Sequence, residues 1–98
     1  MELKVKNGEI ISFTRAEIHA SVNGFATVDT YTVSNPDLNE ITIDKLKKIF
    51  NEKENLEEML ITTMEGQSFT KSYTSVKSIE MTLMEAGTVI NILLVSKE

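Results

Sequence analysis

His19 has the most versatile side chain for chemistry in this sequence, because an imidazole can act as a general base or as a metal ligand. It is the single histidine of a 98-residue chain that contains no cysteine. Neither Glu17 nor Asp29, nor any nearby serine, has a spacing specific to a catalytic triad. One imidazole without a thiolate also falls short of a transition-metal site. We therefore predict no catalytic residue, no metal site and no enzymatic activity.

Phosphate chemistry has equally little support in the sequence. The four glycines are far apart, and neither a glycine-rich phosphate loop nor the pattern Gly-x-Ser-x-Gly occurs. Lys45, Lys47 and Lys48 form the densest basic patch, but the net charge of -5 opposes general nucleic-acid affinity. We therefore expect no cofactor, no nucleic-acid partner and no small-molecule substrate.

The elements that would position these side chains are mostly strands, and glycines mark the turns between them. Asn7-Gly8 predicts a two-residue type I′ hairpin turn after the first strand. Asn23-Gly24 predicts a second hairpin between a strand that reaches as far as Val22 and a third strand, so the first three strands should form a meander. Further hairpins are predicted at Glu65-Gly66-Gln67 and at residues 85–88.

One short helix is predicted near residues 43–50. Thr42 is a suitable N-cap, and the apolar stripe of the helix consists of Ile43, Leu46, Ile49 and Phe50. We therefore predict a single domain over residues 1–98 of the α+β class, predominantly antiparallel β. Its six to seven strands, arranged as hairpins, would form a curled sheet, a barrel or a sandwich.

The predicted helix is too small to cover the predicted sheet. Seven strands in one open sheet would span roughly 30 Å. A helix of about nine residues is only about 13 Å long and about 10 Å across. The sheet must therefore curl, split, or be covered by something else.

The last predicted strand is apolar on both sides. One side carries Val89, Leu93 and Val95, and the other carries Ile90, Ile92 and Leu94. Such strands are normally buried on both sides. The strand is therefore either the centre of a small barrel or sandwich whose other face receives the helix, or it packs one side against another subunit.

The five methionines suit either a core or an adaptable binding surface, and we favour core packing for most of them. If Met81 points inward, strict alternation points Met84 outward. Met84 is therefore the better candidate for an exposed contact.

A resemblance to known proteins lies in the overall sequence pattern rather than in a motif. It is clearest in two segments, Asn7-Gly8-Glu9-Ile10-Ile11-Ser12-Phe13 and Tyr73-Thr74-Ser75-Val76-Lys77-Ser78-Ile79. With the strand-rich pattern around them, the chain resembles small uncharacterised β-rich proteins of phages and prophages in Gram-positive bacteria. The resemblance carries over no functional residue. It implies a virion, tail or assembly component that is cytoplasmic in a bacterial host, with incorporation into a virion as a further fate.

The sequence therefore predicts a structural or assembly protein that acts through protein–protein contacts and forms a homo-oligomer. The predicted contacts are the side of the last hairpin that the helix leaves uncovered, with Met84, Val89, Leu93 and Val95, and the free edge of the first strand. No apolar stretch reaches the roughly 20 residues needed to cross a membrane, so no membrane contact is expected.

The alternative is a small acidic regulatory protein that binds or inhibits a host protein. Its contact region would be the acidic loop at residues 52–58, with Glu57 and Glu58 as contact residues. The simpler interpretation of this carboxylate pair is a solvated turn, because adjacent side chains point apart on a strand or a helix.

Overall fold

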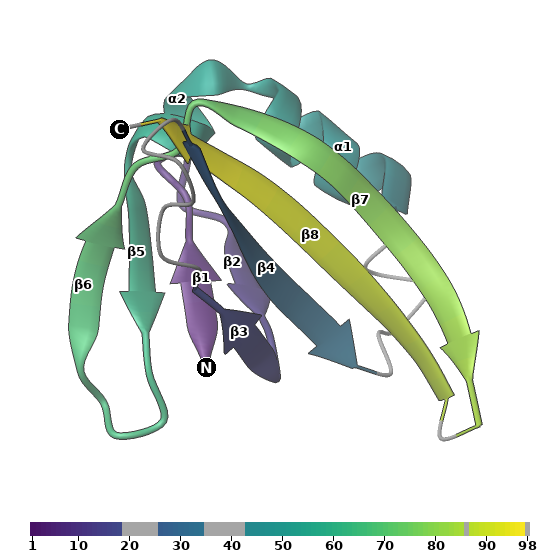
Figure 1. Ribbon diagram of the computed structural model, residues 1–98. Helices are drawn as coiled ribbons and strands as arrows, with labels where there is room; N and C mark the ends of the chain where they lie inside the picture. The colour runs from purple at the N-terminus through teal and green to yellow at the C-terminus, as the bar shows by residue number, and fades with distance from the viewer. Residues whose placement is uncertain (19–25, 35–42, 86, 98) are drawn as a thin grey trace.

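Two four-stranded antiparallel sheets make up most of the fold (Figure 1). The computed structural model describes residues 1–18, 26–34, 43–85 and 87–97. Sheet A has the strand order β2-β1-β5-β6 and consists of β1 Glu2–Lys4, β2 Ile10–Ser12, β5 Met59–Thr62 and β6 Ser68–Lys71. Sheet B has the order β3-β4-β8-β7 and consists of β3 Arg15–Glu17, β4 Ala26–Ser34, β7 Ser75–Met84 and β8 Gly87–Lys97. The helices are α1 Ile43–Asn51 and α2 Lys53–Glu57.

The predicted class, α+β with mostly antiparallel strands, is confirmed. The sheets are not closed into a barrel, and α2 adds a second helix to the one predicted. The predicted meander is wrong, because the predicted second strand divides into β2 in sheet A and β3 in sheet B. His19, the Asn23-Gly24 turn and the Thr42 cap lie outside the described residues.

The predicted hairpin at Asn7-Gly8 joins β1 to β2, but its turn is longer than predicted. The Gly8 amide donates to the Val5 carbonyl over 2.9 Å, and the Val5 amide donates to the Glu9 carbonyl over 3.0 Å. Gly8 has a φ of 98°, in the left-handed region that favours glycine. This is the pattern of a three-residue loop with a glycine bulge rather than a two-residue turn. The β5–β6 hairpin repeats it around Gly66.

The first passage of the chain from sheet A to sheet B is at Phe13 and Thr14. The Phe13 amide donates to the carbonyl of Met1, beside β1, over 3.0 Å. The next amide, that of Thr14, donates to the carbonyl of Thr32 in β4 over 2.8 Å. Consecutive residues therefore belong to different sheets, which divides the long strand that the sequence predicts here.

The second passage is at Tyr73 and Thr74, where the Thr74 amide donates to the carbonyl of Val95 in β8 over 2.7 Å. Phe13 and Tyr73, the buried aromatic residues at the two passages, both contact Tyr31 edge-on. Their ring centroids lie 5.1 and 6.3 Å from that of Tyr31. Edge-to-face pairs at this spacing are favourable, so the three rings hold the two sheets together where the chain crosses.

The first strand lies inside sheet A, between two partners. Leu3 of β1 is opposite Ile11 of β2 on one side and opposite Ile61 of β5 on the other. The prediction that β1 presents a free edge for contacts is therefore wrong. The sequence did not reveal this pairing, because β5 is far from β1 along the chain.

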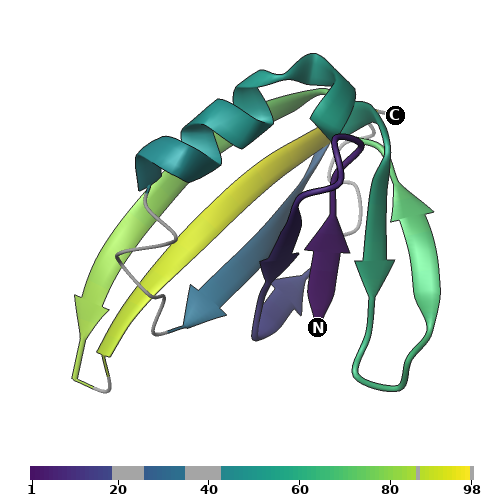
Figure 2. The ribbon, with the colours of Figure 1, turned by 180° about the vertical axis from the view of Figure 1, so that it is seen from behind.

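Helix α1 packs its apolar stripe onto sheet B beside β7 (Figure 2). Leu46, Ile49 and Phe50 are buried, as predicted, and Ile43 is partly buried against the core. Past the end of α1, the buried Asn55 of α2 donates from Nδ2 to the Ile49 carbonyl over 2.8 Å. Its Oδ1 accepts from the Asn7 amide over 3.1 Å, which ties the β1–β2 turn to the helices.

One hydrophobic core combines residues from both sheets and both helices. It includes Leu3 and Ile61 of sheet A, Ile92 of sheet B, Leu46 of α1 and Leu56 of α2. We call the face of sheet B that carries Ile92 its inner face and the opposite face its outer face.

Candidate interaction surface

Strand β8 lies between β4 and β7 and presents apolar residues to both faces of sheet B, as the sequence predicts. On the inner face, Ile90, Ile92 and Leu94 are fully buried. On the outer face, Val89, Leu93 and Val95 are only partly buried. The core therefore occupies one side of β8, whereas the other side keeps part of its apolar surface in contact with solvent.

Short hydroxyl side chains border the apolar residues of the outer face. Leu93 has Thr30 of β4 on one side and Ser78 of β7 on the other. Asn91, the polar member of β8, accepts a hydrogen bond at Oδ1 from the Thr32 hydroxyl over 2.7 Å. The outer face is thus an apolar strip flanked by hydroxyls, a composition that suits a contact surface with satisfied polar groups.

A shallow depression of about 540 Å³ lies over this face and brings several predicted contact residues together. Met84, Val89 and Leu93 all line it, whereas Val95 lies on the same face but outside the depression. Arg15 and Glu17 of β3 form a 2.6 Å ion pair at its rim. The rim is therefore charged while the middle is apolar.

The far end of the β7–β8 hairpin carries the most exposed large apolar side chains of sheet B. Met84 is 59% exposed, as predicted for an outward contact. Met81 and Leu83 are on the inner face, opposite Ile90 and Thr88, yet they are 48% and 84% exposed. Both views of the ribbon show why, because the hairpin extends beyond the N-terminal end of α1 (Figures 1 and 2).

Methionine burial differs from the sequence-based expectation. Met59 lies in the core, but Met64, Met81 and Met84 are exposed. Core packing therefore does not account for most methionines of the second half. Alternation correctly placed Met81 and Met84 on opposite faces, but the inner face is not covered at Met81.

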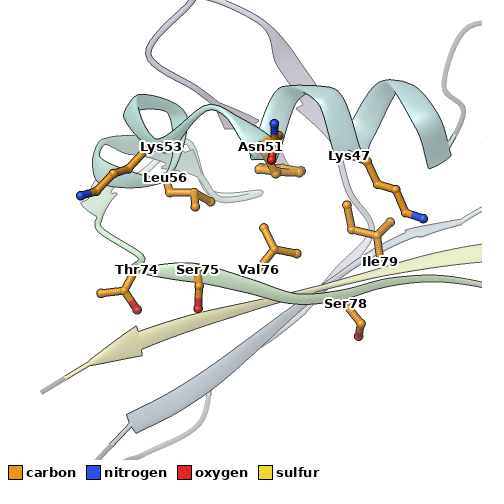
Figure 3. Close-up of a pocket in the computed structure, with 10 residues that line it drawn as sticks. Lys47, Asn51, Lys53, Leu56, Thr74, Ser75, Val76, Ser78 and Ile79 are labelled. Carbon is orange, nitrogen blue, oxygen red and sulfur yellow. The ribbon is translucent and has the colours of Figure 1, made fainter.

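A second depression, of about 600 Å³, lies between the helices and β7 (Figure 3). Val76 and Ile79 point from β7 toward the helices, where Leu56 faces them, while Ser78 points the other way. Lys47 extends at one side of this depression. The sequence did not reveal it, because it forms between two segments that meet only in the folded chain.

A buried polar cluster lies on the inner side of sheet B. The Tyr73 hydroxyl donates to Asp29 Oδ2 over 2.8 Å, and the Tyr31 and Tyr73 hydroxyls lie 2.5 Å apart. Lys71 Nζ lies 3.2 Å from the same carboxylate oxygen of Asp29, which is only 1% exposed. Sequence reasoning considered Asp29 only as a triad member and did not detect this cluster.

The electrostatics of this cluster keep both phenols protonated. Burial, with the nearby Asp29 carboxylate, raises the pKa of Tyr31 to about 12, although its hydrogen bond with Tyr73 acts in the opposite direction. Burial raises the pKa of Tyr73 further, helped by its contacts with Tyr31 and Asp29. At neutral pH both hydroxyls therefore keep their protons. The Tyr73 hydroxyl satisfies the buried carboxylate, and the Tyr31 hydroxyl bonds with that of Tyr73.

The two predicted acidic contact residues lie apart from this surface. Glu57 is the last residue of α2 and Glu58 follows it before β5, and both are exposed. The predicted acidic loop is therefore largely helical. The Glu57 carbonyl accepts a hydrogen bond from the Ser72 hydroxyl over 2.5 Å, which ties this segment to the end of β6.

Comparisons with known proteins returned nothing: no family model, no curated protein and no solved structure matches this chain. Within the described ranges, no helix is long and apolar enough to cross a membrane. In the same part of the chain, no group of three or more histidine, aspartate or glutamate side chains is placed to hold a metal ion.

Proposed function

We propose that this protein is a non-enzymatic structural or assembly protein that acts through protein–protein contacts, including contacts between its own copies. The resemblance to small phage and prophage proteins supports a role as a virion, tail or assembly component. The contact surface is the β7–β8 hairpin, with Met84, Val89 and Leu93 on its outer face.

The observation that carries this proposal is the uncovered apolar end of the hairpin. Leu83 is 84% exposed on the inner face and Met84 is 59% exposed on the outer face, so the end of the hairpin is apolar on both sides. Single exposed apolar residues are normal on protein surfaces, but a contiguous group rimmed by polar residues is typical of interaction sites. On the outer face, Met84 continues the partly buried apolar strip of β8, because Met84, Val89 and Leu93 line the same depression.

The buried polar cluster supports the non-enzymatic part of the proposal. Its carboxylate, Asp29, is enclosed, and the two phenols near it keep their protons at neutral pH. Hydrogen bonds that satisfy a buried carboxylate contribute to the stability and specificity of the fold.

Sedimentation velocity of the full chain over a range of concentrations tests the proposal. We expect species heavier than the 11.0 kDa protomer at high micromolar concentration. Leu83→Ser should weaken this association, because it removes apolar surface, and it should leave the free energy of unfolding within about 0.5 kcal/mol because the residue is exposed.

Leu60→Ser is the matched control, since Leu60 is also exposed but lies in β5 of sheet A. It should leave the association unchanged. A strictly monomeric wild-type chain at high micromolar concentration would contradict the self-association that we propose.

A further inference from the structure

Strand β7 is one of the two edges of sheet B, and among the described strands only β8 pairs with it. It is ten residues long, so it presents a long row of backbone groups on its other side. Edges of this kind accept another strand unless something prevents it. Features that prevent strand addition occur in only one of the two halves of β7.

The half of β7 near α1 carries recognised protections against strand addition. The pairing with β8 shifts register between Val76 and Ser78, which leaves the exposed Lys77 at an irregularity. Bulges and lysines are devices that disfavour edge pairing. Helix α1 also lies over this half (Figure 2).

The other half, from Ser78 to Met84, lacks these protections. Its pairing with β8 is regular, it contains no proline, and Glu80 is its one charged residue. It also carries two exposed apolar side chains on the inner face, Met81 and Leu83. Two chains that each carry a net charge of -5 repel each other. This half of β7 has little charge and no feature that prevents strand addition, so a second copy can approach here.

We propose that β7 pairs antiparallel with β7 of a second copy, around a two-fold axis at Met81. This inference rests on the proposed self-association and specifies its geometry. Met81 of each copy then faces Met81 of the other, and Ile79 faces Leu83 of the second copy on the same inner face. On the outer face, Glu80 lies opposite Thr82 of the second copy.

Neighbouring registers fit less well. Moving the axis to Glu80 places two carboxylates directly opposite each other, which is destabilising. Moving it to Thr82 places Glu80 opposite the apolar Met84 and Ile79 opposite Glu85. The register centred on Met81 pairs the inner-face apolar residues with one another and the carboxylate with a hydroxyl, and on the outer face it places Ser78 opposite Met84.

This self-complementarity argues for a second copy rather than an unrelated strand. A two-fold contact uses the same patch on both partners, so each residue must suit its symmetry mate. Ser78 to Met84 meets that condition in one register. Two four-stranded sheets would join into one continuous sheet, and Met81 and Leu83 of each copy would pack beside Met81 and Ile79 of the other.

Disulfide cross-linking tests the register directly. The chain has no cysteine, so Met81→Cys can form a disulfide only with another copy. Directly opposite residues in antiparallel strands have Cα atoms about 4.5–5.5 Å apart, within the range of a disulfide. We expect Met81→Cys to give a covalent dimer rapidly under mild oxidation.

Two other single-cysteine variants are the controls. Leu83→Cys lies on the same strand, but the two copies of residue 83 would be about 13 Å apart. Met64 is 83% exposed, close to the 84% of Leu83, but it lies in the β5–β6 turn, so Met64→Cys is the second control. Both should cross-link only at the slow rate of random collision.

Charge variants at Thr82 provide a second test that needs no cysteine. Thr82→Glu places a carboxylate opposite Glu80 twice per dimer, and Thr82→Lys places an ammonium there twice. We expect the dimer dissociation constant to rise several-fold for Thr82→Glu and to fall several-fold for Thr82→Lys. Thr70→Glu and Thr70→Lys, on the exposed β6, change the net charge equally and should shift the constant little.

The outcomes separate this inference from the proposed function. If the protein self-associates, but Met81→Cys cross-links no faster than its controls or Thr82 variants behave like those at Thr70, the β7 pairing is wrong and self-association stands. If the wild type is strictly monomeric, both fail. Rapid cross-linking at Met81 with opposite effects of the two Thr82 variants supports both.

Discussion

The two faces of sheet B have similar apolar residues but different surroundings. On the inner face, Ile92 has no exposed surface, because sheet A and the helices enclose it. On the outer face, its neighbour Leu93 is partly exposed between two rows of hydroxyl side chains. The inner face therefore holds the fold together, and the outer face keeps part of its apolar surface in contact with solvent.

The polar groups of the two faces differ in the same way. The inner side encloses Asp29 with the hydroxyl of Tyr73. The outer face pairs Thr32 with Asn91 in a half-exposed position where water can reach both. A polar group that water cannot reach depends on its protein partner. Removing one hydroxyl should therefore lower the free energy of unfolding more on the inner face than on the outer face.

The largest effect is expected from truncation at β8. Ile92→Ala should lower the free energy of unfolding by about 2–5 kcal/mol, because it leaves a cavity in the core. Leu93→Ala should cost about 1 kcal/mol at protein concentrations where the chain is monomeric. Urea denaturation of both variants measures the difference, and equal losses would show that the outer face is as well covered within one protomer as the inner face.

The next effect concerns the buried hydroxyls. Tyr73→Phe removes the donor to Asp29 and the partner of the Tyr31 hydroxyl, so we expect a loss of about 1–3 kcal/mol. Thr32→Val on the outer face removes a hydrogen bond to Asn91 that water can replace, and it should cost about 0.5 kcal/mol. Thermal or urea denaturation compares them, and a larger loss for Thr32→Val would reverse our assignment of the two faces.

A further effect of the inner side appears only at alkaline pH. Because the pKa of Tyr31 is raised to about 12 and that of Tyr73 is also raised, the unfolded chain loses these protons first. Stability is therefore complete below about pH 10 and falls as pH rises toward 12, by about 1.4 kcal/mol per pH unit for each phenol.

Tyrosinate absorbance measures this titration cleanly, because these are the two tyrosines of a chain without tryptophan. Ionisation should coincide with loss of the far-ultraviolet circular dichroism of the fold. Phenols that titrate near pH 10 in a folded chain would show that the cluster is open to solvent. Tyr31→Phe should give a shallower loss of stability with pH.

The proposed self-association also involves the inner face of sheet B. The inner-face residues Met81 and Leu83 lie beyond the end of α1, so the inner face itself is incomplete at the end of the hairpin. Pairing of β7 with a second copy would place Met81 and Leu83 beside Met81 and Ile79 of that copy. Association would then change the exposure of these two side chains more than that of Leu93.

Local patterns were sufficient for the β1–β2, β5–β6 and β7–β8 hairpins and for the main helix. Glycines at positions 8 and 66 adopt positive φ in turns that the sequence located, and the stripe from Ile43 to Phe50 lies on the buried side of α1. These features depend on neighbours within a few residues, so the chain encodes them directly. Turn length at Asn7-Gly8 was missed because the hydrogen bond from Val5 to Glu9 adds a residue to the loop.

The partnering of strands could not be obtained in this way. The pairing of β1 with β5, the switch of sheets at Phe13 and the burial of Asp29 against Tyr73 all join segments that are far apart in sequence. Alternation placed Met84 outward correctly, but exposure of Met81 depends on where α1 ends above β7. The same reason explains why the depression between α1, α2 and β7 was not foreseen.

The amino-acid sequence by itself determined the strand-rich class, the position of the glycine turns, the helix near residues 43–50 and the two apolar sides of β8, because backbone conformation and side-chain period are local properties. Only the tertiary structure decided which side of β8 the core occupies, which strand edge is left unpaired and which polar groups are enclosed. Those outcomes depend on how segments far apart in the sequence pack against one another, and no short stretch of the chain contains that information.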